Sequence, residues 1–235
     1  MRASSDRRPP PDSCRRCGTC CQKGGPAFHG QDRRLIDTGA IEARFLFTIR
    51  RGEPSFDNIR GTLVPAETDI IKIRGRRNSW CCTFFNDRDN GCDIYADRPM
   101  ECRLLKCWDP SAITSAYRAN RLTRADLLRE VTGLWELVDA HQVRCDYAAI
   151  LPDMKKLPTP EESAARRRIT EALLYDREIR RLAQEQAGVA PDLCDFLFGR
   201  PLSDTLSGLG LDVRETEGRI TLVCNAHHRR YLDGL

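Results

Sequence analysis

Cysteine spacing limits what this chain can fold into more than any other feature of its sequence. Twelve cysteines occur in 235 residues, and four of them fall within the eight positions from 14 to 21. Four more follow with nine, nine and four residues between them. Buried cysteines that act as small hydrophobic side chains give no reason for such clustering, so both sets indicate metal ligation. The candidate ligands are Cys14, Cys17, Cys20, Cys21, Cys82, Cys92, Cys102 and Cys107.

The first set has the spacing C-x2-C-x2-C-C. A C-x2-C turn brings two thiolates to one metal without straining the backbone. Three cysteines at successive x2 spacings are typical of a loop that holds an iron–sulfur cluster, with a fourth thiolate from elsewhere. Gly18 lies inside this run and suits a close approach of the backbone to the metal. Cys20 and Cys21 would point to opposite sides of an extended backbone, so either they serve two centres or one of them is structural.

Two other roles for clustered thiols fit the sequence less well. A secreted disulfide scaffold is smaller and carries a signal sequence, whereas residues 1–13 are polar, basic and proline-rich, which is typical of a disordered tail. A redox dithiol is the main alternative, because C-x2-C also supports disulfide exchange. However, no βαβ pattern surrounds the motif, and eight thiols exceed what a dithiol needs. We therefore expect a cytoplasmic metalloprotein.

Charge and hydropathy argue against two classes of partner. The chain has no run of about 18 apolar residues, so we expect no membrane span. Its net charge of +4 falls short of the excess that is typical of a dedicated nucleic-acid binder. The arginines at 166–168 and 180–181 are interpreted as the solvated face of a helix. The expected partner is a client protein or a redox partner protein.

Apolar patterning predicts an α+β fold. Residues 68–74 alternate as a strand does, and residues 80–85 and 92–95 read as two strands of a hairpin around the turn Asp87–Gly91. Residues 41–49 suggest a helical turn or two. We expect this part of the chain to be a small, irregular antiparallel β domain around the cysteine cluster.

The rest of the chain has mainly helical patterns. An apolar stripe from Thr123 to about His141 predicts an amphipathic helix. Thr159-Pro160-Glu161-Glu162 is a helix start, and that helix should run to about Gln186 and stop at Gly188. Residues 191–198 suggest a short helical turn, and residues 211–216 and 219–224 a hairpin. The predicted organisation is a tail at 1–13, a metal-binding domain at 14–109, and a helical region with a C-terminal hairpin at 110–235.

The second cysteine block carries a resemblance to a known family. It reads Trp80, Cys82-Thr-Phe84, Asn90-Gly91-Cys92-Asp-Ile94-Tyr95, Arg98-Pro99, Cys102-Arg103 and Cys107. Together with the first run, it resembles the YkgJ-like C-x2-C-x2-C-C cysteine-cluster family of zinc- or iron-chelating domains over residues 14–109. The departures are Phe85 in place of the usual leucine, Leu104-Leu105-Lys106 where Phe-Pro is common, and the extra thiol of Cys81.

The resemblance implies a cytoplasmic metal-bound domain with these eight ligands, but it implies no reaction. One relative, the flagellin lysine N-methylase, carries this domain within a larger methyltransferase. The present sequence has no glycine-rich strand-to-helix turn with an acidic partner downstream, as an S-adenosylmethionine site would need. Whether this chain is an enzyme is left open.

Two metals fit the eight thiols by count: zinc in tetrahedral sites, or iron in one or two clusters. The triple-cysteine run and the long spacings of the second set favour an iron–sulfur cluster, 4Fe–4S, over zinc. The first hypothesis is therefore a redox or accessory protein. The alternatives are a zinc-stabilised binding module and a metal-dependent enzyme that modifies a protein or a nucleic acid.

Other candidate ligands have simpler interpretations. His141 and Cys145, four residues apart, are interpreted as a polar helix end and a buried thiol, with a metal pair as the alternative. Cys224 with His227 and His228 is a minor metal or docking candidate. Cys194 is expected in the core. Trp80 and Trp108, which bracket the second cysteine block, are expected to shield the metal in a hydrophobic shell.

Overall fold

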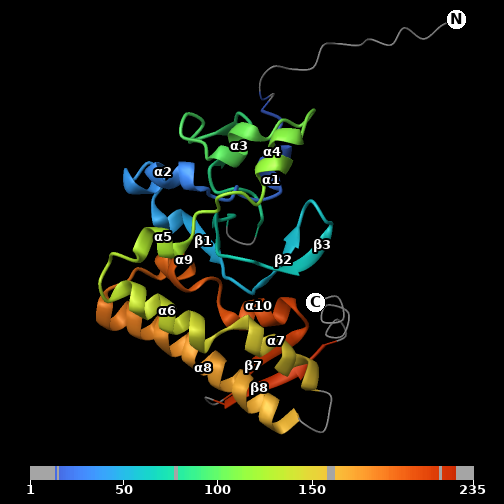
Figure 1. Cartoon of the computed structure of the whole chain (residues 1–235), viewed down its shortest axis with the longest axis vertical. Coiled ribbons are helices and arrows are strands. Elements are labelled where there is room, and N and C mark those ends of the chain that lie inside the picture. Colours follow the sequence, from blue (N-terminus) through green and yellow to red (C-terminus); the bar gives the residue numbers. More distant parts are fainter. Residues whose placement is uncertain (1–13, 15, 77–78, 158–161, 217–218, 226–235) are drawn as a thin grey trace, which may run out of the picture.

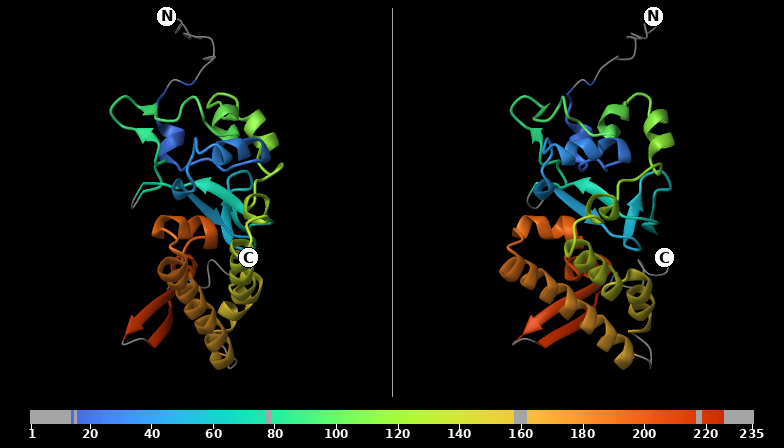
Figure 2. Two further views of the ribbon diagram at one scale, coloured as in Figure 1. Left: turned by 90° about the vertical axis from the view of Figure 1, so that its left-hand side faces the viewer. Right: turned by 60° about the vertical axis from the view of Figure 1, so that its left-hand side comes forward.

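Short antiparallel strand pairs and helices build the chain, which confirms the α+β class (Figure 1). The computed structural model describes residues 14, 16–76, 79–157, 162–216 and 219–225. Each sheet within these residues has two antiparallel strands. The cysteine-rich segments lie toward one end of the molecule and the longest helix toward the other, as the two rotated views in Figure 2 also show. The predicted tail at 1–13 lies outside the described residues.

The N-terminal half consists of short elements. In chain order they are α1 (Thr19–Gln22), η1 (Gly30–Asp32), α2 (Arg33–Asp37), η2 (Ala43–Phe45), β1 (Leu46–Ile49), β2 (Pro54–Asp57), β3 (Thr62–Pro65), β4 (Ile70–Ile73), β5 (Phe85–Asn86), β6 (Gly91–Cys92), α3 (Met100–Leu104) and α4 (Ser111–Ala116). The strand pairs are β1–β4, β2–β3 and β5–β6.

Longer helices dominate the C-terminal half. They are α5 (Arg124–Leu128), α6 (Leu134–Arg144), α7 (Tyr147–Lys156), α8 (Glu162–Ala187), η3 (Pro191–Leu193), α9 (Cys194–Phe198) and α10 (Leu202–Gly208), and the hairpin of β7 (Leu211–Thr216) and β8 (Arg219–Cys224) follows them. No helix in the described ranges is long and apolar enough to cross a membrane.

The β1–β4 pair confirms one predicted element and corrects another. The strand predicted over 68–74 is present as β4, but the helical turns predicted over 41–49 are wrong beyond the short η2. Leu46 pairs with Ile73 in an antiparallel register, and both side chains are buried. The Thr48 hydroxyl donates a hydrogen bond of 2.7 Å to the carbonyl of Phe196 in α9. Packing against α9 therefore favours a strand here.

The hairpin predicted around Asp87–Gly91 is present, but its strands are shorter than expected. Only Phe85–Asn86 and Gly91–Cys92 pair as β5 and β6. The preceding backbone makes other hydrogen bonds, because the N–H of Cys82 donates to the carbonyl of Cys21 at 2.7 Å. This bond places the second cysteine set against the first instead of extending a sheet.

The helix predicted from Thr123 to about His141 is two helices. α5 begins with a capping box in which the Thr123 hydroxyl accepts from the N–H of Asp126. The chain then leaves the helical path, and α6 starts after Gly133, whose φ of 81° is in the left-handed region. The break lets α6 pack along α8, which one straight helix from Thr123 would not do.

The other elements predicted for this half are confirmed where the structure describes them, but Arg180, predicted on the solvated face of the helix, is buried. α8 ends at Ala187, and Gly188 has a φ of 64°, as a C-terminal glycine cap requires. The predicted turn at 191–198 is η3 followed by α9, and the hairpin strands are β7 and β8. The predicted helix start at Thr159-Pro160-Glu161 lies outside the described residues.

One hydrophobic core spans the predicted boundary between residues 109 and 110. It joins Phe28, Leu46 and Ile71 to Ile179 and Phe198 of the C-terminal half. A second core cluster lies among α7, α8, α10 and the β7–β8 hairpin. Because the first core is shared, the helical region buries apolar surface of the N-terminal half, and the boundary at 109 stays a prediction.

Candidate metal centre

The first cysteine set lies in and just before α1. Gly18 precedes this helix with a φ of 74°, and Cys20 and Cys21 occupy its first turn, with their Sγ atoms 3.9 Å apart. The expectation that they point to opposite sides is wrong, because it assumed an extended backbone. On the helix the two thiols are neighbours and face the same region.

Proton sharing prepares this thiol pair for a metal. A hydrogen bond between the two thiols lowers the pKa of the Cys20 thiol to about 6 and raises that of Cys21. Arg98 also lowers the pKa of Cys20 by its charge. A lowered pKa favours the thiolate of Cys20, which is the form that binds metal.

The second set surrounds the first from three elements. Cys82 precedes β5, Cys92 ends β6, Cys102 lies on α3, and Cys107 follows that helix. All twelve cysteines are free thiols.

Electrostatic interactions connect the two sets. Burial raises the pKa of Cys102, and the charges of Cys82, Cys92 and Cys20 raise it further. Burial also raises the pKa of Cys82 to about 11, with a further contribution from Cys92. Burial raises the pKa of Cys107, and the charges of Cys20, Cys17 and Cys14 raise it further. Burial also raises the pKa of Cys92, and the charge of Cys14 adds to this effect. Cys21 interacts with Cys82 and Cys102. Each of the eight predicted ligands thus lies within electrostatic reach of others.

Two of the sulfurs, those of Cys20 and Cys21, lie 3.9 Å apart, and the rest of the set is more open. Among the described residues, three ligand atoms lie within 4.8 Å of one another at His141, Cys145 and Asp176, and no three of the eight cysteines do. Exposure also differs across the set: Cys82 is buried, whereas Cys14, Cys17 and Cys107 are exposed. One edge of the cysteine group therefore reaches solvent and the opposite edge faces the core.

Gly18 is also needed at a close contact that the sequence does not show. A Cβ at this position would lie 2.5 Å from the Phe85 ring. Gly18 therefore lies close to Phe85, a core residue at the start of β5. This contact places the start of α1 against the second cysteine block.

We expect Gly18→Ala to lower the stability of the folded chain by more than the roughly 1–2 kcal/mol that a left-handed backbone costs alanine. Gly39→Ala is the matched control, because Gly39 has a φ of 73° and nothing within 4 Å of an added Cβ. Urea unfolding of both variants measures the difference. Equal losses would contradict the proposed contact with Phe85.

The sequence did not reveal the side chains behind Cys102. Glu101 accepts hydrogen bonds from the Ala27 N–H at 2.7 Å and from Arg121 at 2.9 Å, and its Oε1 lies 3.3 Å from Nε2 of His29. His29 is fully buried. No sequence pattern links these positions. The group can be recognised only in the folded chain, where Glu101 contacts the segment that follows the first cysteine set.

The other predicted positions have simpler surroundings. Trp80 is 68% exposed and Trp108 36%, which is too open for the expected shield around a metal. Cys81 is half-buried, and Cys194 is buried in the core as predicted. Cys224 is exposed, and His227 and His228 lie outside the described residues.

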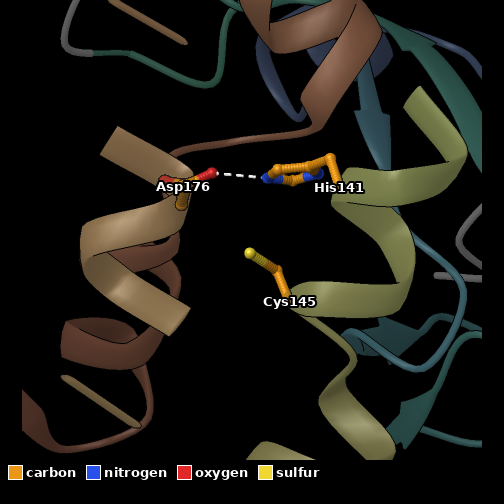
Figure 3. Close-up of side chains that lie close together, drawn as sticks. All are labelled: His141, Cys145 and Asp176. Carbon is orange, nitrogen blue, oxygen red and sulfur yellow. Dashed lines mark hydrogen bonds and ion pairs between the residues drawn. The ribbon is translucent and has the colours of Figure 1, made fainter. Parts of the chain in front are cut away.

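His141 and Cys145 meet a third residue, Asp176 of α8 (Figure 3). Nε2 of His141 donates to Oδ1 of Asp176 at 2.7 Å, and the same carboxylate accepts from Arg180 at 3.0 Å and from the Leu202 N–H at 2.9 Å. Because these donors already occupy Asp176, and Arg180 places a cation beside it, the group is a hydrogen-bonded contact between α6 and α8.

This contact predicts acid sensitivity. Burial lowers the pKa of His141 from 6.5 to about 4, so the unfolded chain binds its proton first as the pH falls. Burial raises the pKa of Asp176, but the His141 hydrogen bond and the charge of Arg180 outweigh it, so this pKa is lowered. Protonation of Asp176 at still lower pH therefore also reduces the stability of the folded chain. Stability should fall below about pH 6.5, by about 2 kcal/mol between about pH 7 and about pH 5. Urea unfolding across this range measures the slope, and a His141→Asn variant with the same slope would contradict the assignment.

The arrangement of the cysteines agrees with a comparison to protein-family models. Residues 13–123 match the CxxCxxCC model, which is described as "Putative zinc- or iron-chelating domain". This segment is a CxxCxxCC domain. The domain contains all eight predicted ligands and extends past residue 109, through α4 to the start of α5. No curated protein and no solved structure matches the chain. Chelation of zinc or iron is the function that the CxxCxxCC domain indicates.

Proposed function

We propose that the CxxCxxCC domain holds one or two iron–sulfur clusters of the 4Fe–4S type, for which the eight cysteines of the two sets are the candidate ligands. The cysteine spacing carries this proposal, because three cysteines at successive x2 spacings are typical of a loop that holds such a cluster, and the second set has no C-x2-C turn of the kind that structural zinc sites pair. Interactions between the two sets support it, because the charges of Cys82, Cys92 and Cys20 all act on Cys102.

The proposed role is that of a redox or accessory protein in the cytoplasm. Exposed Cys14, Cys17 and Cys107 support it, because a partner protein can approach a centre whose ligands reach the surface. The partner is a redox protein that exchanges an electron with the cluster, or a client that receives it.

Two cavities near the surface lie away from the cysteines. One of about 450 Å³ is lined by residues of α6, α7 and α8, and a smaller one by residues near β2, β3 and α4. None of the eight cysteines lines either cavity. Neither cavity is therefore a pocket at the proposed metal centre.

Anaerobic purification tests the proposal. We expect a brown protein with about four or about eight iron atoms per chain, matching sulfide, and absorption that bleaches with dithionite and returns on reoxidation. A colourless protein with stoichiometric zinc would overturn it and favour the zinc-stabilised binding module. Cys81→Ser and Cys194→Ser are controls, because neither thiol belongs to the proposed ligand set.

A further inference from the structure

α3, which carries Cys102, is held by carboxylates at two points. Its own Glu101 bonds the backbone of Ala27, in the segment that follows the first cysteine set. Asp32 is fully buried, and its Oδ1 accepts the N–H of Met100 at 2.8 Å. Together these two bonds hold α3, the helix that carries Cys102, against the segment that follows the first cysteine set.

His29 links the two carboxylates. Its backbone N–H donates to Oδ2 of Asp32 at 3.1 Å, and Nε2 of its ring lies 3.3 Å from Oε1 of Glu101. The other ring nitrogen lies 2.6 Å from the carbonyl of Ala119. The ring is therefore fixed on both sides, and it limits where the Glu101 side chain can lie.

Each oxygen of the Glu101 carboxylate accepts from a group that can only donate, Arg121 at Oε1 and the Ala27 N–H at Oε2. Oε1 faces Arg121 and His29, and Oε2 faces the Ala27 N–H. The Arg121 side chain is 7% exposed and that of Glu101 13%, so water cannot readily replace these partners. An amide in place of the carboxylate would turn an NH2 group toward a donor in either orientation.

We propose that Glu101 is a positioning residue for the metal centre, acting with His29 and Asp32 to hold Cys102 at its place among the eight sulfurs. Residues behind metal ligands orient them, and their loss typically lowers metal affinity by about 10–100-fold. Glu101 adjoins Cys102 on α3, so displacement of its carboxylate moves the helical turn that carries the thiol. This inference rests on the proposed metal centre but holds for either metal.

Glu101→Gln in the full chain tests the role, because the change keeps the side-chain volume. We expect metal release to a chelator to be about 10–100-fold easier, and the visible spectrum of an iron-loaded chain, or of a cobalt-substituted zinc chain, to change. Asp97→Asn is the matched control: it removes the same charge from an exposed position four residues earlier and should behave as the wild type.

Circular dichroism and thermal unfolding of the same samples separate positioning from folding. If Glu101→Gln does not fold, Arg121→Met, which removes one bond from the carboxylate, takes its place with the same expectation. A folded variant with wild-type metal release and spectrum would overturn the role of Glu101. A wild-type chain that binds no metal would instead refute the proposed function, so the two failures are distinguishable.

Discussion

Cys17→Ser should release most of the metal from the CxxCxxCC domain and lower the stability of that domain. Loss of a ligand should exceed the roughly 10–100-fold loss of affinity that follows removal of a residue behind the ligands. Because a metal site forms only in the folded chain, metal affinity contributes directly to folding. Cys17 is exposed, and a hydrogen bond with the Thr19 hydroxyl lowers its pKa, so the substitution removes a candidate ligand without opening the core.

Elemental analysis and thermal unfolding of the anaerobically purified variant measure both effects. The chain without metal gives the reference, since Cys17→Ser should then unfold at nearly the wild-type temperature. Cys81→Ser, the control in the second cysteine block, should keep its metal. Wild-type metal content in Cys17→Ser would remove this residue from the ligand set.

Asp69→Asn should destabilise the whole chain by about 3–5 kcal/mol, as does removal of one partner from other buried ion pairs. Both oxygens of Asp69 accept from Arg124, at 2.8 and 3.0 Å, and the Arg124 side chain is only 3% exposed. Arg124 also donates to the Leu197 carbonyl at 2.7 Å and to Gln142 at 2.9 Å. The substitution would leave a buried guanidinium without its counter-charge at the junction of α5, α6 and α9.

Urea unfolding gives the comparison with an exposed pair. Glu178→Gln removes one of the two carboxylate partners of Arg181 on the solvent side of α8 and should cost much less stability than Asp69→Asn. Similar losses in the two variants would show that the Asp69–Arg124 pair is solvated in practice. The further hydrogen-bond partners of this pair are Arg51, Leu197 and Gln142 and include none of the eight candidate ligands, so metal content per folded chain should not change in Asp69→Asn.

The candidate ligands could be named from the sequence because their signal is local. Four cysteines within eight residues are far more typical of metal ligation than of core packing, and the turn between Cys14 and Cys17 needs only a short stretch of backbone. The β7–β8 hairpin and the end of α8 before Gly188 are local in the same sense. Alternation, helix periodicity and glycine caps act between residues a few positions apart, so each can be read without the fold.

Sequence patterns failed where partners distant in the chain decide the conformation. β1 replaces the predicted helical turns because its backbone pairs with β4 and Thr48 bonds α9. The segment before β5 leaves the predicted strand because Cys82 bonds Cys21. In each case a long-range contact outweighs a weak local preference.

The sequence by itself determined that this chain carries eight thiols in two metal-type sets, and which turns and helix ends flank them. Only the tertiary structure decided that the thiols of Cys20 and Cys21 are neighbours on a helix, that thiols of the two sets interact, and that Glu101 bonds the segment that follows the first set. The physical reason is the separation along the chain over which each interaction acts. Backbone geometry couples residues a few positions apart, whereas burial and long-range hydrogen bonds are determined only when the chain packs.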